Sequence, residues 1–289
     1  MPNLRIATLA VLSSVLFATA GLAKPPVWIV RDADSEMVLF GSVHVLQPNL
    51  DWQPKAVIQA LAQADDVWFE LNLSPETDQE VTSLAASKGI LPPGLSLFSM
   101  LSPRDRTRLS RACQRFHMAP GLLDRLEPWY AEVALAGAAF SEAGAESDSG
   151  VERVLADLAP TTASRHAFET AEQQIDMLAG ASRSSQLASL RISLEELERD
   201  PHAYDRLVSV WMAADVKSLE RNAIAPLVAS APDMYRRMVL DRNRAWAQTL
   251  DSRLKGQGRT VVVVGVGHLI GKDGVPAQLR ALGYSVEGP

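Results

Sequence analysis

Apolar positions gather in short runs at the start of the chain and again at its end. The runs Val27–Val30 and Met37–Phe40 have the composition of strands, and the turn-rich residues 32–35 between them predict a hairpin. A third run, at 67–71, follows a stretch from 54 to 64 whose apolar residues recur at helical spacing. This succession of strand, helix and strand favours an α/β sheet.

Helical patterns fill the middle of the chain. Ser74 and Pro75 predict a helix start, and Lys88 followed by Gly89 predicts its end. Further helices are predicted at 103–118, 122–126, 129–140, 151–158, from 170 onward, and through 183–254, with a strand at 165–169. The uninterrupted apolar run at 260–264 is typical of a strand buried on both faces, and a helix at 275–282 and a strand at 284–286 follow it.

The predicted strands therefore cluster at the two ends of the chain. Because terminal strands must share a sheet to bury their apolar faces, we expect one α/β domain over 24–289 with a mixed central sheet. A large helical insertion interrupts it, with a helical subdomain at about 75–160 and further helices at about 183–254.

Residues 1–23 have the layout of a secretory signal peptide. Arg5 precedes an uncharged apolar run, and the small residues Ala20 and Ala23 each fit a cleavage site. The run is long enough that retention as a membrane anchor is the alternative, but its threonine, serine and glycine residues favour cleavage. We therefore expect an exported protein, periplasmic in a bacterium, with no stable membrane anchor after cleavage.

Charge and cysteine content exclude two classes of function. Lys and Arg total 28 against 34 Asp and Glu, and a net charge of −6 argues against a nucleic acid as partner. The single cysteine, Cys113, excludes an intrachain disulfide. It lies in a helical pattern, and we interpret it as a packing residue rather than a nucleophile.

Two segments share the pattern of a strand that ends in Gly-x-x-His. They run from Gly41 to His44 and from Gly265 to His268, whereas about 0.3 such matches are expected from 17 glycines and five histidines in 289 residues. Glycine permits a sharp exit from a strand, so both histidines are expected at the carboxyl edge of the sheet, where α/β proteins bind ligands. Either histidine alone has an alternative interpretation, a hydrogen-bonded polar residue at a strand end.

Acidic residues end two other predicted strands. Glu70 follows an apolar run, where a carboxylate is costly unless it is paired, protonated or bound to a metal. Glu169 is the parallel case, although it could simply cap the helix after it. Two imidazoles with one or two carboxylates make either a divalent-metal site or a metal-free acid/base pair, and both lead to hydrolysis. Of the other histidines, His166 is a doubtful candidate and His117 and His202 are interpreted as structural.

In this order along the chain, the motifs resemble those of the TraB/PrgY/GumN family, which is related to the Tiki proteases of animals. The resemblance covers nearly all of 24–289 and is carried by these segments: 39–46, 67–70, 150–152, 168–170, 241–246, 263–269, 274–275 and 282–286. Phe168 departs from the family's usual leucine, and Glu152 stands where aspartate is commoner, which puts a catalytic role at 152 in doubt.

The resemblance implies a fold similar to erythromycin esterase-like and ChaN-like proteins, with an internal duplication that brings both Gly-x-x-His motifs to one site. It implies that His44, Glu70 and His268 are metal ligands or catalytic bases. Arg242 and Asn243 match a helical Arg-Asn motif whose arginine stabilises an oxyanion, and Asn243 and Glu169 are the expected substrate contacts.

Three functions follow as hypotheses. The first is a metal-dependent hydrolase, a peptidase, that uses Mn, Co or Zn. The second is a metal-free esterase with His44 as general base. The third is a binding protein that sequesters a peptide or a polysaccharide-related ligand without turnover, as PrgY-like members suggest. Each takes a peptide or a small molecule as its partner, and the sequence leaves the oligomeric state open.

Overall fold

A computed structural model of the chain describes residues 24–289. The predicted signal peptide at 1–23 lies outside the described residues. A six-stranded mixed sheet forms the centre, in the order β4-β3-β5-β2-β1-β6. Its strands are β1 Val27–Arg31, β2 Ser35–Ser42, β3 Asp66–Phe69, β4 Ser164–Ala167, β5 Gly258–Gly265 and β6 Ser285–Glu287. The predicted mixed α/β sheet is confirmed, although it takes in β4 from the middle of the chain besides the strands nearer its two ends.

Four neighbouring strands of this sheet run in the same direction. β5 pairs in parallel with β2 on one side and β3 on the other, and β3 pairs in parallel with β4. The predicted hairpin of β1 and β2 is confirmed, and β6 adds to β1 in antiparallel orientation. The carboxyl ends of β2, β3, β4 and β5 therefore meet at one edge, and the polar motifs follow them there.

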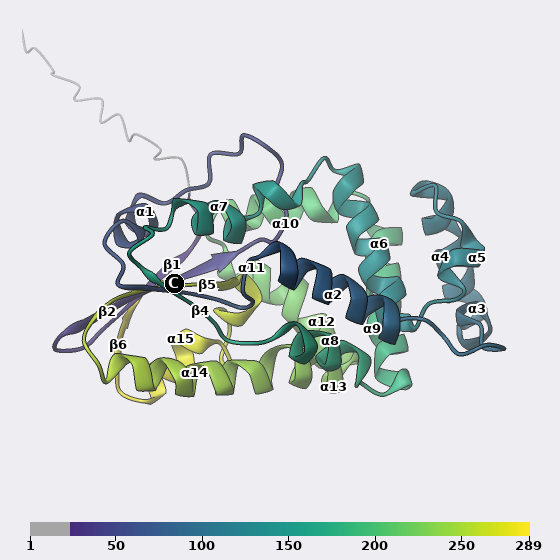
Figure 1. The fold of residues 1–289 in the computed structure, drawn as a ribbon. Coiled ribbons are helices and arrows are strands. Elements are labelled where there is room, and N and C mark those ends of the chain that lie inside the picture. The colour runs from purple at the N-terminus through teal and green to yellow at the C-terminus, as the bar shows by residue number, and fades with distance from the viewer. Residues whose placement is uncertain (1–23) are drawn as a thin grey trace, which may run out of the picture.

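Helices cover both faces of the sheet, with α1 Lys55–Leu61 and α7 Val151–Leu158 on one side and α14 Asp241–Leu254 and α15 Val275–Ala281 on the other (Figure 1). β5 is buried along Thr260–Val264, as its unbroken apolar run predicts for a central strand. Trp28, Phe40 and Leu155 contribute fully buried side chains to this core. This core fixes the position of the sheet edge where the polar motifs follow β2, β3, β4 and β5.

The remaining helices form a lobe that extends from the sheet, with the helices of residues 97–123 farthest away (Figure 1). The helices of the lobe are α2 Pro75–Lys88, α3 Leu97–Met100, α4 Pro103–Arg115, α5 Pro120–Leu123, α6 Pro128–Glu142, α8 Ala171–Ala179, α9 Arg183–Arg199, α10 Ala203–Met212, α11 Val216–Leu219, α12 Ala225–Ser230 and α13 Pro232–Tyr235. A second core, which includes Leu97, Leu109, Leu123 and Leu190, joins α3, α4, α5, α6 and α9. None of the helices in 24–289 is long and apolar enough to cross a bilayer.

Local signals in the sequence set most helix ends. The Ser74 hydroxyl accepts from the Thr77 N–H at the start of α2, and Thr170 and Gln173 form a reciprocal capping box at the start of α8. The prediction for 122–126 is wrong in register, because Pro120 begins α5 and the helix ends at Leu123. Two π-helical segments, Glu220–Ile224 and Arg236–Leu240, carry no such signal and were not predicted.

Candidate active site

The sheet edge brings together the four residues that end its parallel strands. His44, Glu70, Glu169 and His268 follow β2, β3, β4 and β5. Their proximity is clearest at Gly265, where an added Cβ would lie 3.2 Å from Glu70 Oε1, 3.6 Å from His44 Nε2 and 3.7 Å from His268 Cδ2. The two Gly-x-x-His motifs therefore converge on one place, as their positions after strands predict.

His44 is held by a buried carboxylate. Its Nδ1 lies 2.5 Å from Glu152 Oε1, and the Ser42 hydroxyl donates to the same oxygen at 2.6 Å. The imidazole is 67% exposed while the Glu152 side chain is only 10% exposed. The charge of Glu152 raises the pKa of His44 well above its usual value, so its proton is held at neutral pH.

Backbone contacts place Glu152 beside that histidine. The Val151 N–H, in the first turn of α7, donates to the Val43 carbonyl at 3.2 Å. Gly150 precedes it, and a Cβ there would overlap the carbonyl oxygen of His44. The close approach of the start of α7 to the His44 backbone needs a glycine at position 150, and it places the Glu152 carboxylate beside the imidazole. Glu152 is a site residue that the sequence did not assign, although the Gly150-Val151-Glu152 motif was the signal for it.

His268 is buried and has a different partner. Its Nδ1 lies 2.6 Å from the amide oxygen of Asn243, whose amide nitrogen donates to the Asp273 carbonyl at 2.8 Å. Because that carbonyl can only accept, the amide orientation is fixed and His268 Nδ1 must carry the hydrogen. Burial, reinforced by Arg242, lowers the pKa of His268 to about 3, and the ring is neutral with its Nε2 lone pair facing the cluster.

Arg242 hydrogen-bonds to the carboxylates of Glu70 and Glu169 and to the Nε2 lone pair of His268. Its Nε and Nη2 donate to Glu169 at 2.7 and 2.9 Å, and Nη2 also donates to Glu70 at 2.5 Å. Nη1 donates to the Met238 carbonyl at 3.1 Å and to His268 Nε2 at 3.0 Å. These five bonds use all five N–H groups of a guanidinium. Arg242 thus positions its neighbours, and no N–H remains for the predicted oxyanion contact in this arrangement.

Glu70 lies between the two histidine loops. Its Oε1 accepts from the Gly265 N–H at 2.7 Å and lies 4.0 Å from His268 Nε2. Burial disfavours its charged form, but the nearby positive charges of Arg242 and His44 and the Gly265 N–H outweigh that cost and lower the pKa of Glu70 below its usual value. The carboxylate is therefore ionised at neutral pH.

The predicted substrate contacts have other partners. Asn243 is 0% exposed and holds His268, so the buried amide is a positioning group. Glu169 binds Arg242 and accepts from the Trp246 indole at 3.1 Å. Of the remaining candidates, His166 stacks on Trp68 at the outer strand of the sheet, and Cys113 is buried in the second core as predicted.

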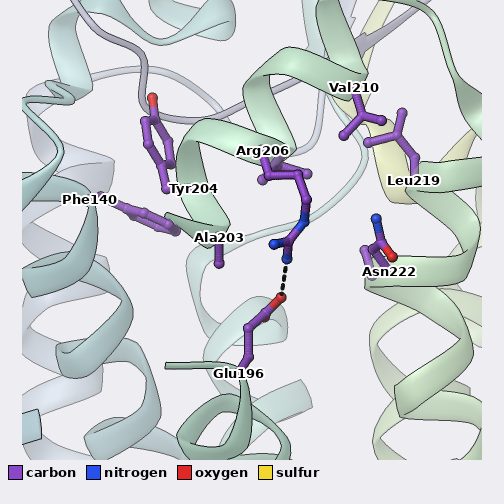
Figure 2. Close-up of a pocket in the computed structure, with 10 residues that line it drawn as sticks. Phe140, Glu196, Ala203, Tyr204, Arg206, Val210, Leu219 and Asn222 are labelled. Carbon is purple, nitrogen blue, oxygen red and sulfur yellow. Dashed lines mark hydrogen bonds and ion pairs between the residues drawn. The ribbon is translucent and has the colours of Figure 1, made fainter. Parts of the chain in front are cut away.

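A cleft of about 320 Å³ opens beside the cluster. It is lined by His44, Val45, Phe69, Glu70, Leu71, Leu73, Ser147, Glu152, Arg153 and Gln174. A smaller cavity of about 190 Å³ lies among α6, α9, α10 and α11, where Arg206 donates to Glu196 across one end (Figure 2). None of its lining residues belongs to the cluster, whereas His44, Glu70 and Glu152 line the first cleft.

The arrangement of donor groups bears on metal binding. Across 24–289, no three imidazole, thiol or carboxylate groups are arranged as a ready metal site. The donors themselves fit a divalent cation: each histidine has its Nδ1 held by a buried acceptor and its Nε2 toward the cluster, as in metal sites with an ordered outer shell. With neutral imidazoles, Glu70, Glu152 and Glu169 exceed Arg242 by two negative charges, which a divalent cation would balance.

Fold and site together define an α/β protein with paired Gly-x-x-His loops around an arginine and glutamate cluster. The chain belongs to the TraB/PrgY/gumN family, whose sequence model matches residues 26–288. It is 24% identical over 260 residues to "Uncharacterized protein YbaP" of Escherichia coli (strain K12), covering 89% of this chain and 92% of the relative. A protein of the same name from Shigella flexneri matches to the same extent. No solved structure matches the chain.

Proposed function

We propose that the protein is a hydrolase that activates water for attack on a peptide bond at the cluster of His44, Glu70 and His268. The observation that carries this proposal is the orientation of the two imidazoles. Each is fixed through Nδ1 by a buried acceptor, Glu152 or Asn243, and each turns its Nε2 toward the same small space. Such preorganised nitrogen groups around one point serve proton transfer or metal binding.

In the form we favour, His44, Glu70 and His268 hold a divalent cation, Mn, Co or Zn. Bound there, it would supply Lewis-acid polarisation of the substrate carbonyl and a water of lowered pKa. Glu152 then keeps His44 oriented, and Asn243 keeps His268 in the tautomer with an unprotonated Nε2, which accepts from Arg242 in this arrangement. Arg242 fixes Glu70 and neutralises part of its charge. The apolar lining of the cleft, Phe69, Leu71 and Leu73, supports binding of an apolar side chain.

A metal-free reaction is the second candidate, and one observation favours it. Arg242 already donates to both His268 Nε2 and Glu70. The exposed imidazole of His44 and the buried carboxylate of Glu152 form a hydrogen-bonded pair that needs no further group. His44 would take a proton from water as the general base. Because its pKa is raised, it must first lose its own proton, and activity in this form rises with pH above neutrality.

The experiment is a peptide-library and ester digest by the purified wild type and the H44A and H268A variants, with chelator, with added Mn, Co or Zn, and with metal analysis. The metal-dependent form predicts bound metal, activity lost in chelator and restored by metal, and loss of both in either variant. H166A is the matched control, because His166 stacks on Trp68 away from the cluster, and it should retain activity.

Other outcomes decide between the remaining hypotheses. Activity that survives chelator and disappears in H44A supports the metal-free esterase. Ligand binding without product, unchanged in H44A, contradicts hydrolysis and supports a binding protein for a peptide or polysaccharide-related ligand. Fractionation of the source cells with N-terminal sequencing tests the proposed export to the periplasm, for which residues 1–23 are the reason.

A further inference from the structure

Helix α10 touches the loop that carries His44 at two points. The Trp211 indole N–H donates to the Gly41 carbonyl at 2.8 Å, and the Tyr204 hydroxyl donates to the Val45 carbonyl at 3.1 Å. These two carbonyls bracket the Gly-x-x-His motif, one at its first residue and one just after its last. Neither α10 side chain contacts the cluster itself.

The spacing along the helix matches the spacing of the loop. Tyr204 and Trp211 are seven residues apart, so they lie on one face of α10, separated by about 10 Å along its axis. The four-residue step from Gly41 to Val45 spans at most about 14 Å of chain. One rigid element therefore holds both ends of the loop at a fixed separation.

Each donor is itself fixed by packing. Trp211 is 0% exposed and packs against Phe40 and Trp52, with ring centroids 6.2 and 6.1 Å apart. Tyr204 is buried at 7% exposure, packs against Phe140, and turns its ring toward the smaller cavity (Figure 2). On its other side the loop is held by the Val151 N–H, which donates to the Val43 carbonyl and belongs to the turn that bears Glu152.

We propose that Tyr204 and Trp211 are positioning residues for His44: they hold its loop against the start of α7, so that the imidazole keeps its contact with Glu152 and its orientation toward the cleft. This inference rests on the proposed hydrolase function for its kinetic consequence. Its structural consequence, a loop whose order depends on two side chains of α10, can be measured without activity.

The test compares Y204F, W211F and the double variant with two matched controls. Y204F removes only the hydroxyl. W28F is the control for W211F, because the Trp28 indole is equally buried and donates to the Pro289 carbonyl at 3.2 Å. Y284F is the control for Y204F, because its hydroxyl donates to Asp251. Amide hydrogen exchange of residues 42–46 and the separate values of kcat and KM are measured for all five variants.

The double variant should exchange the amides of 42–46 about tenfold faster than wild type, and its kcat should fall about tenfold with KM within about twofold. The controls should leave both readouts within about twofold of wild type. Unchanged exchange at 42–46 overturns the proposal, and so does faster exchange with unchanged kcat. If the wild type hydrolyses nothing, the proposed function fails, and the exchange data alone decide whether α10 orders the loop.

Discussion

The two Gly-x-x-His loops leave adjacent parallel strands, and yet they hold their histidines in opposite states. His44 is 67% exposed beside a carboxylate and keeps a proton, whereas His268 is 9% exposed beside an amide and an arginine and stays neutral. The repeated motif determines where each imidazole lies. The charge of Glu152 raises the pKa of His44, whereas burial and the charge of Arg242 lower the pKa of His268.

The largest effect on this contrast is expected from Arg242. In R242M, Glu70 and Glu169 lose the guanidinium that pairs with both, and His268 Nε2 loses its donor. Because the two carboxylates are only 10% and 11% exposed, the unpaired charges should lower the free energy of unfolding by about 3–5 kcal/mol. Urea denaturation measures it.

R31M is the control for this substitution. Arg31 also pairs with two glutamates, Glu36 and Glu287, but its side chain is 41% exposed and theirs are 39% and 66% exposed. Removal of an exposed pair should cost less than about 1 kcal/mol. Equal losses in R242M and R31M would mean that the cluster contributes no more to stability than a surface ion pair.

The neutral state of His268 predicts acid sensitivity. Its pKa is about 3 in the folded protein and 6.5 in the reference state, so the unfolded chain binds the extra proton as pH falls below 6.5. The contribution of neutral His268 to the free energy of unfolding is therefore fully present above pH 6.5 and is lost as the pH falls toward 3. From pH 6.5 down to 4.5, the usual pKa of glutamate, wild type should lose about 2 kcal/mol more than H268Q.

Urea denaturation across that pH range makes the comparison. The glutamine in H268Q has no proton to gain, so the remaining acid sensitivity of the protein cancels in the difference. Parallel pH dependences for wild type and H268Q would show that His268 takes up its proton at the same pH in the folded protein as in the unfolded chain, and its lowered pKa would be contradicted.

An exchange of the two partners should bring the two states closer. In E152Q, His44 keeps a hydrogen-bond acceptor but loses the neighbouring charge, and its pKa should fall by about one unit or more. In N243D, His268 gains a carboxylate on Nδ1, and its pKa should rise by a similar amount. Histidine NMR titration measures both. Unshifted values would assign the contrast to burial alone.

The sequence predicted the positions in this comparison and missed the partners. The positions of His44, Glu70 and His268 at strand ends followed from local patterns. A glycine after a strand, or a glutamate after an apolar run, can be recognised within a few residues of sequence. The contact between His44 and Glu152 joins residues 108 positions apart. The guanidinium of Arg242 likewise contacts Glu70, Glu169 and His268, which are distant in the sequence. No periodicity carries that information, since such contacts depend on how helices pack on the sheet.

The resemblance of motifs supplied part of what periodicity could not. It brought Arg242 and Asn243 to the site, but as an oxyanion donor and a substrate contact, whereas the structure commits both to hydrogen bonds within the protein. It also counted Glu152 as a departure from a commoner aspartate. In the structure that longer side chain reaches both Ser42 and His44.

The smallest effect on stability, and the most local one, is expected at Gly265. Its φ of −48° suits any residue, so G265A is not strained in its backbone, and its methyl group would contact Glu70 at 3.2 Å and the two imidazoles at 3.6 and 3.7 Å. Small shifts of these side chains should limit the loss of unfolding free energy to about 1 kcal/mol. Activity should fall at least about tenfold, because the methyl group enters the space that the imidazoles face.

G137A is the matched control for that change. Gly137 lies within α6 with open space around its Cα, so the same methyl group should stabilise the helix by about 0.5–1 kcal/mol and leave activity unchanged. Denaturation and the same digest, run on both variants, separate the stability effect from the effect on the site. An active G265A would show that the space between the two histidine loops is not where the substrate reacts, because a methyl group placed among His44, Glu70 and His268 cannot leave that space open.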